Sequence, residues 1–253
     1  IEPAPVGFLD ALSAIVDENL ILHVHGEDPD SFLLERESDF VFSRFLETFF
    51  NNHPGGRLVM EHVSTHAGIE AVQRLQREGY QIAGSITLHH MLLSLDDTYG
   101  QVHNCCWPAP RYYHDRDSCW GVAMLGQPGF FLGSDSAPHT QAAKYQPQCS
   151  CGCYTAPLLI EKLAELFAKD TWLDGGGAGP QHSERMRRFV SKNACDFFGV
   201  PESETWLTLM RGEWTVPATS WDIYDEKCTD VARIWQAGSK VQFMIEGHSY
   251  RKT

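Results

Sequence analysis

The sequence lacks the features that would place it in a membrane or on nucleic acid. No apolar run reaches the roughly 20 residues that a membrane span requires, and no signal-peptide pattern opens the chain. Basic residues are scarce, because 20 lysines and arginines stand against 33 aspartates and glutamates and leave a formal net charge of −13. Acidic surfaces repel phosphates. We therefore expect a soluble protein with no nucleic-acid partner and no membrane span.

Glycosylation signals are also missing, since no Asn-x-Ser or Asn-x-Thr triplet occurs in the chain. The chain carries eight cysteines, an even number, but it is too long to be a small disulfide-rich secreted domain. We therefore expect reduced thiols and an intracellular location, in the cytoplasm or in an organelle such as the mitochondrion. The chain begins with Ile1 in place of methionine, which suggests a processed, truncated or partly covered protein.

The sequence does contain a regular alternation of apolar strands and amphipathic helices. Short apolar runs predict strands, and apolar positions that repeat every three or four residues predict helices. The predicted strands are 20–25, 57–62, 81–87 and 129–134, and the predicted helices include 8–18, 30–50, 64–79, 115–125 and 183–198. The aromatic stripe along 42–50 is expected to face the core. This alternation predicts an α/β fold with a parallel sheet that supplies four of the eight strands of a closed barrel.

Three of the predicted strands end in a residue that can bind a metal. His25 closes the first strand, His62 closes the second, and Asp135 follows the fourth. The carboxyl ends of parallel strands share one rim of an α/β barrel, where the active sites of this fold lie. A single histidine is more often a structural residue. Three such residues at three strand ends favour one metal site made of His25, His62 and Asp135.

Other residues of the same types have simpler interpretations. Cys149, Cys151 and Cys153 could form a separate zinc site, but their spacing is tighter than the Cys-x₂₋₄-Cys of structural zinc sites. A loop with a role near the active site is the favoured interpretation. His89 and His90 follow the third strand, and we expect them to shape the rim rather than to bind a metal.

Seven short motifs occur in one order along the chain. They are His-Gly-Glu at 25–27, Glu-His at 61–62, Thr-x-His-His-x-Leu-Leu at 87–93, Asp-Asp at 96–97, Asn-x-Cys-x-Pro at 104–108, Leu-Gly-Ser-Asp-Ser-Ala-Pro-His at 132–139 and Tyr-Thr-Ala-Pro at 154–157. The ordered set resembles dihydroorotase of the monofunctional bacterial and fungal type, in the amidohydrolase superfamily. The Thr-x-His-His and Asp-Asp segments look closest to the fungal branch.

The resemblance implies a fold and an activity. The family has a (β/α)8 TIM-type barrel with two zinc ions. It hydrolyses the cyclic amide of dihydroorotate to N-carbamoyl-aspartate in pyrimidine biosynthesis, and it closes the ring in reverse. The chain would then be the C-terminal part of such a metal-dependent hydrolase barrel, with strands five to eight in residues 1–200. Residues 201–253 would form a C-terminal extension packed on the barrel.

The resemblance also implies roles for individual residues. His25 and His62 resemble the two imidazole ligands of one zinc. Asp135 resembles the carboxylate on the other zinc, which also takes the proton from the bridging water. Contacts to the substrate, through a side chain or the main chain, are implied for three further residues: His139, Trp107 and Cys151.

The chemistry agrees with these roles. An amide is a poor electrophile and water a poor nucleophile, and zinc both polarises a carbonyl and lowers the pKa of water from about 15.7 towards 7. A carboxylate such as Asp135 can pass the proton to the leaving nitrogen, a step typically worth about 10²–10⁴-fold. Glu27 or Glu61 is expected to fix the tautomer of His25 or His62.

Part of the family's site has no counterpart in the chain. The resemblance begins after the family's His-x-His pair, its carboxylated lysine, and the arginine and asparagine that bind the substrate carboxylate. The His-x-His spelling at 23–25 does not replace that pair, because the Gly-Glu that follows assigns it to the fifth strand.

Two hypotheses remain. The first is a zinc-dependent dihydroorotase whose N-terminal strands lie outside this chain and whose partner is a small-molecule substrate, dihydroorotate. The second is a degenerate, catalytically inactive relative with a structural role. An open half-barrel exposes strand edges, so we expect a homodimer or a subunit of a larger complex.

Overall fold

A four-stranded parallel sheet lies at the centre of the computed structural model, which describes residues 7–169, 180–219 and 231–247. Its strands run in the order β1-β2-β3-β4, and in the first pair His25 lies opposite Glu61. The strands are β1 Ile21–His25, β2 Arg57–Glu61, β3 Gln81–Ile86 and β4 Phe130–Leu132. All four predicted strands, and their parallel arrangement, are confirmed.

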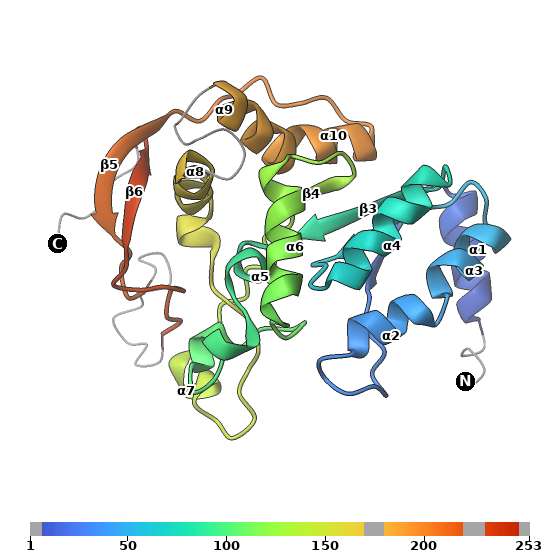
Figure 1. Cartoon of the computed structure of the whole chain (residues 1–253), viewed down its shortest axis with the longest axis horizontal. Coiled ribbons are helices and arrows are strands. Elements are labelled where there is room, and N and C mark those ends of the chain that lie inside the picture. The colour runs from blue at the N-terminus through green and yellow to red at the C-terminus, as the bar shows by residue number, and fades with distance from the viewer. Residues whose placement is uncertain (1–6, 170–179, 220–230, 248–253) are drawn as a thin grey trace.

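Helices connect and cover these strands (Figure 1). The α-helices are α1 Phe8–Asp17, α2 Arg36–Phe42, α3 Phe45–Asn52, α4 His66–Arg77, α5 Leu88–Leu92, α6 Tyr113–Met124, α7 Gln141–Lys144, α8 Leu159–Lys169, α9 Pro180–Arg187 and α10 Asn193–Phe198. Short turns of 3₁₀-helix are η1 Leu95–Asp97, η2 Val102–Asn104 and η3 Ala156–Leu158, and η4 Arg188–Lys192 is a π-helical segment between α9 and α10. Within the described ranges, no helix combines the length and apolarity needed to cross a membrane.

The sheet separates two apolar clusters because successive side chains of a strand point to opposite faces. Leu58 and Met60 of β2 join the large core, which also contains buried residues of α4 and α6. Val59, between them, joins Ala83 and Phe131 in a smaller cluster, against which two phenylalanines of α10 pack. Both faces of the sheet are therefore covered, as expected for buried parallel strands.

Local signals set the ends of α4. The hydroxyl of Thr65 accepts a hydrogen bond from the backbone N–H of Gly68 at 2.9 Å, so Thr65 caps the helix. Gly79, just beyond the helix, has a φ of 92°, which glycine adopts at little cost. The prediction for this helix is confirmed at both ends.

The single helix predicted over 30–50 is wrong. The segment forms two helices, α2 and α3, because Arg44 between them adopts a left-handed φ of 62°, which ends a right-handed helix. The break also turns Phe42 outward, where it is 74% exposed, while Phe49 and Phe50 remain buried. Only the second half of the aromatic stripe faces the core.

The C-terminal residues pack on the rest of the chain. β5 Leu209–Thr215 and β6 Lys240–Ile245 form an antiparallel pair, and β6 contacts α8 (Figure 1). The indole N–H of the buried Trp235 donates to Oδ1 of Asn104 at 2.9 Å, in the long segment between β3 and α6. The division of the chain into residues 1–200 and 201–253 stays a prediction.

The core face of α4 provides a test of this packing. Leu75 has no exposed surface, and Leu75→Ala is expected to lower the free energy of unfolding by about 2–5 kcal/mol, because it removes buried methyl groups and leaves a cavity. Urea unfolding measures this change. The matched control is Leu9→Ala on α1, where the leucine is 61% exposed and the expected loss is smaller. Equal losses in the two variants would contradict the assigned core.

Candidate metal and substrate site

The candidate site lies at the carboxyl end of the parallel sheet. His25 is the last residue of β1, His62 directly follows β2, and Asp135 follows β4. The parallel strands bring these positions to one edge. His62 and Asp135 have φ values of 39° and 37°, in the left-handed region that non-glycine residues seldom adopt. Such backbone strain clusters at functional sites.

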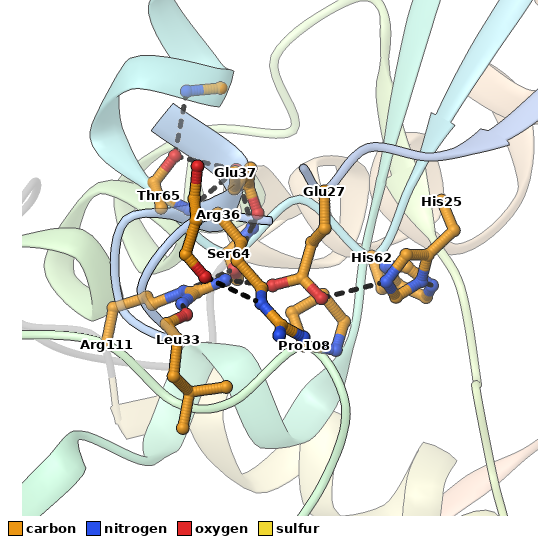
Figure 2. A network of polar contacts seen from close by, with 12 residues as sticks. His25, Glu27, Leu33, Arg36, Glu37, His62, Ser64, Thr65, Pro108 and Arg111 are labelled. Carbon is orange, nitrogen blue, oxygen red and sulfur yellow. Dashed lines mark hydrogen bonds and ion pairs between the residues drawn. The ribbon is translucent and has the colours of Figure 1, made fainter. Parts of the chain in front are cut away.

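Two imidazole rings face each other at this edge. Nδ1 of His25 lies 3.0 Å from Nε2 of His62, and Figure 2 shows the two rings close together. Burial is the main cause that lowers the pKa of His62 to about 4, and the nearby His90 and His25 act in the same direction. His62 is therefore a neutral imidazole, the form that binds metals. Its Nδ1 is buried and has no hydrogen-bond partner among the described residues.

Glu27 determines which nitrogen of His25 faces His62. Nε2 of His25 lies 2.9 Å from Oε2 of Glu27, so Nε2 carries the proton and Nδ1 keeps its lone pair. Glu27 also pairs with Arg111, whose side chain is completely buried. Burial alone would raise the pKa of Glu27, but His25 and Arg111 together lower it. The expectation that a glutamate fixes the tautomer of a histidine is confirmed for this pair.

Glu61 has a different role from the one expected. It does not bond the ring of His62 but accepts from Nδ1 of His23 at 2.6 Å and from the hydroxyl of Ser85. The same hydroxyl accepts from the backbone N–H of His62 at 2.7 Å. Glu61 therefore helps to hold the main chain of His62 in place, through the hydroxyl of Ser85, and does not orient the ring.

A buried carboxylate holds the turn that follows His62. Glu37 of α2 accepts hydrogen bonds from the hydroxyls of Ser64 and Thr65 at 2.6 and 2.7 Å, and from their backbone N–H groups at 2.9 and 3.0 Å. Figure 2 shows this network next to Arg111. Burial raises the pKa of Glu37 in spite of these bonds. The network fixes the chain from the end of β2 into α4.

Asp135 lies beside a second buried imidazole. Its Oδ2 is 3.7 Å from Nε2 of His89. Burial raises the pKa of Asp135, and the charge of Glu61 adds to this effect while His25 opposes it.

The side chains of His89 and His90 are buried, at 0% and 2% exposure, and the expectation that they shape the rim stays a prediction. The hydroxyl of Thr87 caps the single turn of α5, and this turn directs both rings inward. Neither ring nitrogen of His89 has a hydrogen-bond partner in the described part of the chain. His90 bonds Thr87 through Nδ1 at 2.8 Å and the carbonyl of Pro108 through Nε2 at 2.9 Å.

Two groups of residues are candidates for a metal site: the pair of His25 and His62, and the cluster of His89, His90 and Cys106. The His25–His62 pair fits a metal better. Two nitrogens bound to one tetrahedral zinc at about 2.05 Å each lie roughly 3.3 Å apart, close to the 3.0 Å found here. His89, His90 and Cys106 also have ligand atoms within 4.8 Å of one another, but both nitrogens of His90 are engaged. Within the described residues neither the cysteines at 149, 151 and 153 nor the predicted set of His25, His62 and Asp135 forms such a group of three.

The structure brings two of the three predicted substrate contacts together. Nε2 of His139 donates to the carbonyl oxygen of Cys151 at 2.8 Å. Trp107 is 39% exposed and lies under the guanidinium of Arg36, whose central carbon is 5.1 Å from the ring centroid. The roles of all three residues, like those of His25, His62 and Asp135, stay predictions.

Comparison with known proteins identifies relatives, although no protein-family model matches the chain. The chain is 35% identical to the dihydroorotase of Halorhodospira halophila over 216 residues, which are 83% of this chain and 58% of the relative. It is 32% identical to the dihydroorotase of Idiomarina loihiensis over 242 residues, which are 93% of this chain and 64% of the relative.

This chain is a homologue of the dihydroorotases. It spans 58% and 64% of the length of these two relatives. Its motif-based resemblance to that family is confirmed.

Solved structures agree with this relation. The crystal structure of dihydroorotase from Campylobacter jejuni is 31% identical, with a TM-score of 0.77 over 95% of this chain and 66% of that one. That of Saccharomyces cerevisiae dihydroorotase in complex with 5-fluoroorotic acid is 26% identical, with a TM-score of 0.81 over 95% and 67%. A D-hydantoinase from Thermus sp., 13% identical with a TM-score of 0.72, shares the fold. The predicted fold, part of an amidohydrolase barrel, is confirmed.

The sequence did not reveal the groups that support the site. Arg111 lies in a long segment without periodicity, and Glu37 reads as one more charge on an amphipathic helix. Nothing in the local pattern marked Glu37 as buried.

The Glu37 network predicts a large effect from a small substitution. Glu37→Gln keeps the size of the side chain but replaces an acceptor oxygen with an amide nitrogen that cannot accept from Ser64 or Thr65. We expect a loss of about 1–3 kcal/mol in unfolding free energy, measured by urea unfolding. Glu35→Gln, two residues away and exposed, is the control and should change stability by less than about 0.5 kcal/mol. Similar values for both variants would refute the network.

The buried histidines predict a dependence of stability on pH. Burial is the main cause that lowers the pKa of His90 to about 4, whereas histidine in the unfolded chain takes up its proton near pH 6.5. Stability is therefore unaffected by His90 above pH 6.5 and falls as the pH drops towards 4, by up to about 3 kcal/mol. Unfolding of a His90→Gln variant should show a correspondingly shallower pH dependence. A His114→Gln control, at an exposed position, should retain the original slope. If the His90 variant also retained it, the burial of this ring would be wrong.

Proposed function

We propose that the complete protein is a dihydroorotase-like cyclic amidohydrolase, which hydrolyses dihydroorotate to N-carbamoyl-aspartate in pyrimidine biosynthesis. The single observation that carries the proposal is the facing pair of His25 and His62, whose ring nitrogens are 3.0 Å apart at the end of the sheet where Asp135 lies. Homology to dihydroorotases supports it. We propose this activity for the complete protein because this chain spans only 58% and 64% of the length of those two relatives.

Zinc is the proposed cofactor, with two ions in the complete site. His25 would hold one ion through Nδ1 and His62 through Nε2, and Asp135 would supply a carboxylate to the other. Catalytic zinc has at least three protein ligands, so further ligands must come from residues outside this set. When bound, zinc supplies an activated water and a polarised amide carbonyl.

The residues of this chain would orient the groups and move the proton. The carboxylate of Asp135 would accept the proton of the attacking water and return it to the leaving nitrogen. His139, with the main chain at Cys151 and near Trp107, would bind the carboxylate of the substrate.

A structural subunit is the second candidate, and one observation favours it. Among the described strands, β1 and β4 each pair on one side only, and unpaired strand edges bind other strands. A catalytically inactive relative could place this sheet in a larger assembly, or in a homodimer. An intracellular location in the cytoplasm or an organelle is proposed for either candidate.

Two measurements on the same sample of the full-length protein separate the two candidates. One is the turnover of dihydroorotate, monitored by ultraviolet absorbance, and the other is the zinc content. About two zinc ions per chain together with turnover would eliminate the structural candidate. A folded, full-length protein with neither would eliminate the enzyme.

The role of Asp135 gives the sharpest prediction for this activity. Asp135→Asn keeps the size of the side chain but removes the base, and we expect kcat to fall by about 10²–10⁴-fold. The control is Asp117→Asn on the exposed face of α6, which should keep the original rate. A rate for Asp135→Asn within a few-fold of that control would refute the assigned role.

A further inference from the structure

Two cysteines from distant segments touch beside the candidate site. Sγ of Cys105 lies 3.2 Å from Sγ of Cys151, and both are free thiols. Cys105 follows η2, and Cys151 lies in the loop between α7 and η3. The carbonyl of Cys151 is the group that accepts from His139, so the pair lies at the predicted substrate-binding side of the site.

Contacts that do not involve sulfur hold the two segments together. The backbone N–H of Gly152 donates to the carbonyl of Cys105 at 2.8 Å. The ammonium of Lys144, only 3% exposed, donates to the same carbonyl at 3.0 Å and to that of Val102 at 3.1 Å. The sulfur atoms are therefore kept close by the main chain whether or not they react.

Accessibility distinguishes this pair from the buried cysteines nearby, whereas Cys149 in the same loop is also partly exposed. Cys105 and Cys151 are partly exposed, whereas Cys106, Cys119 and Cys153 are buried. A small oxidant in solution can therefore reach the first two thiols and not the last three. The sulfurs are 3.2 Å apart and must approach by about 1.2 Å to reach the roughly 2.05 Å of a disulfide bond.

We propose that Cys105 and Cys151 form a reversible disulfide that responds to the redox state of the surroundings. The oxidant is a small disulfide such as oxidised glutathione. One cysteine thiolate attacks oxidised glutathione, forms a mixed disulfide and releases one glutathione. The second cysteine then attacks the protein sulfur of this mixed disulfide, forms the Cys105–Cys151 bond and releases the second glutathione. The two protein thiols lose two protons and two electrons in total, and the small disulfide is reduced to two thiols. A dithiol reductant reverses the sequence.

The bond would link the loop that contacts His139 to the segment that carries Trp107. This link restricts the relative motion of two groups of the predicted substrate side. The formation of the disulfide does not rest on the proposed function, whereas an effect on turnover does.

The rate of oxidation should depend on pH. Burial, together with the neighbouring Cys151, raises the pKa of Cys105, so its thiolate fraction is small at neutral pH and grows as the pH rises. Oxidation should accordingly accelerate between pH 7 and pH 9.

Mass spectrometry of the full-length protein tests the proposal. After treatment with oxidised glutathione, a non-reducing tryptic digest should contain peptide 78–111 joined to peptide 145–162, with two hydrogen atoms lost and fragmentation placing the bond between Cys105 and Cys151. Dithiothreitol should separate the peptides. Cys105→Ser and Cys151→Ser should each abolish the link, and Cys149→Ser, the matched control in the same loop, should retain it.

Other results would overturn the proposal. A link that persists in Cys105→Ser or disappears in Cys149→Ser would assign the bond to other cysteines. Stable glutathione adducts on unlinked Cys105 and Cys151 in the wild-type protein would show that the two sulfurs do not meet, whatever the variants do. These readouts use no activity, so failure of the disulfide and failure of the proposed function are separate results.

Discussion

The hydrogen bond between His25 and Glu27 is the interaction on which the site depends. It places the proton of His25 on Nε2 and leaves the Nδ1 lone pair facing Nε2 of His62. The side chain of Glu27 is only 3% exposed, and its pKa stays below the ordinary value because His25 and the guanidinium of Arg111 oppose the effect of burial. That cation is one of the two groups that oppose the effect of burial on the pKa of Glu27. The orientation of the imidazole pair thus depends on Arg111, which lies 84 residues from Glu27 in sequence.

The other imidazole is positioned through the main chain. Glu61 and Ser85 hold the backbone N–H of His62, and Glu37 binds the next turn through Ser64 and Thr65. These two carboxylates lie on β2 and α2, which meet only in the folded chain. A buried carboxylate such as Glu37 is stabilising only when its acceptor positions are filled, and its donors include the backbone N–H groups of Ser64 and Thr65 next to the site. The same hydrogen bonds thus satisfy the oxygens of Glu37 and hold the main chain that follows His62 in place.

The fold was largely predictable from the sequence, and the site only in part. Apolar runs that end in His25, His62 and Asp135 identified the strands and their common edge, since strand burial and parallel connection follow from local pattern. The break at Arg44 was missed because a left-handed residue leaves no mark on hydrophobic periodicity. The inward turn of His89 and the pairing of Arg111 with Glu27 were missed because they arise from contacts distant in sequence. The order of the motifs along the chain indicated the relation to the dihydroorotases, which the homologues confirm.

The most direct test of the facing imidazole pair is the position of zinc in a crystal of the full-length protein, located by anomalous scattering at the zinc absorption edge. The account predicts an anomalous peak about 2.0–2.1 Å from both Nδ1 of His25 and Nε2 of His62. Zinc bound only at His89, His90 and Cys106, with the His25 and His62 rings hydrogen-bonded to each other, would contradict it.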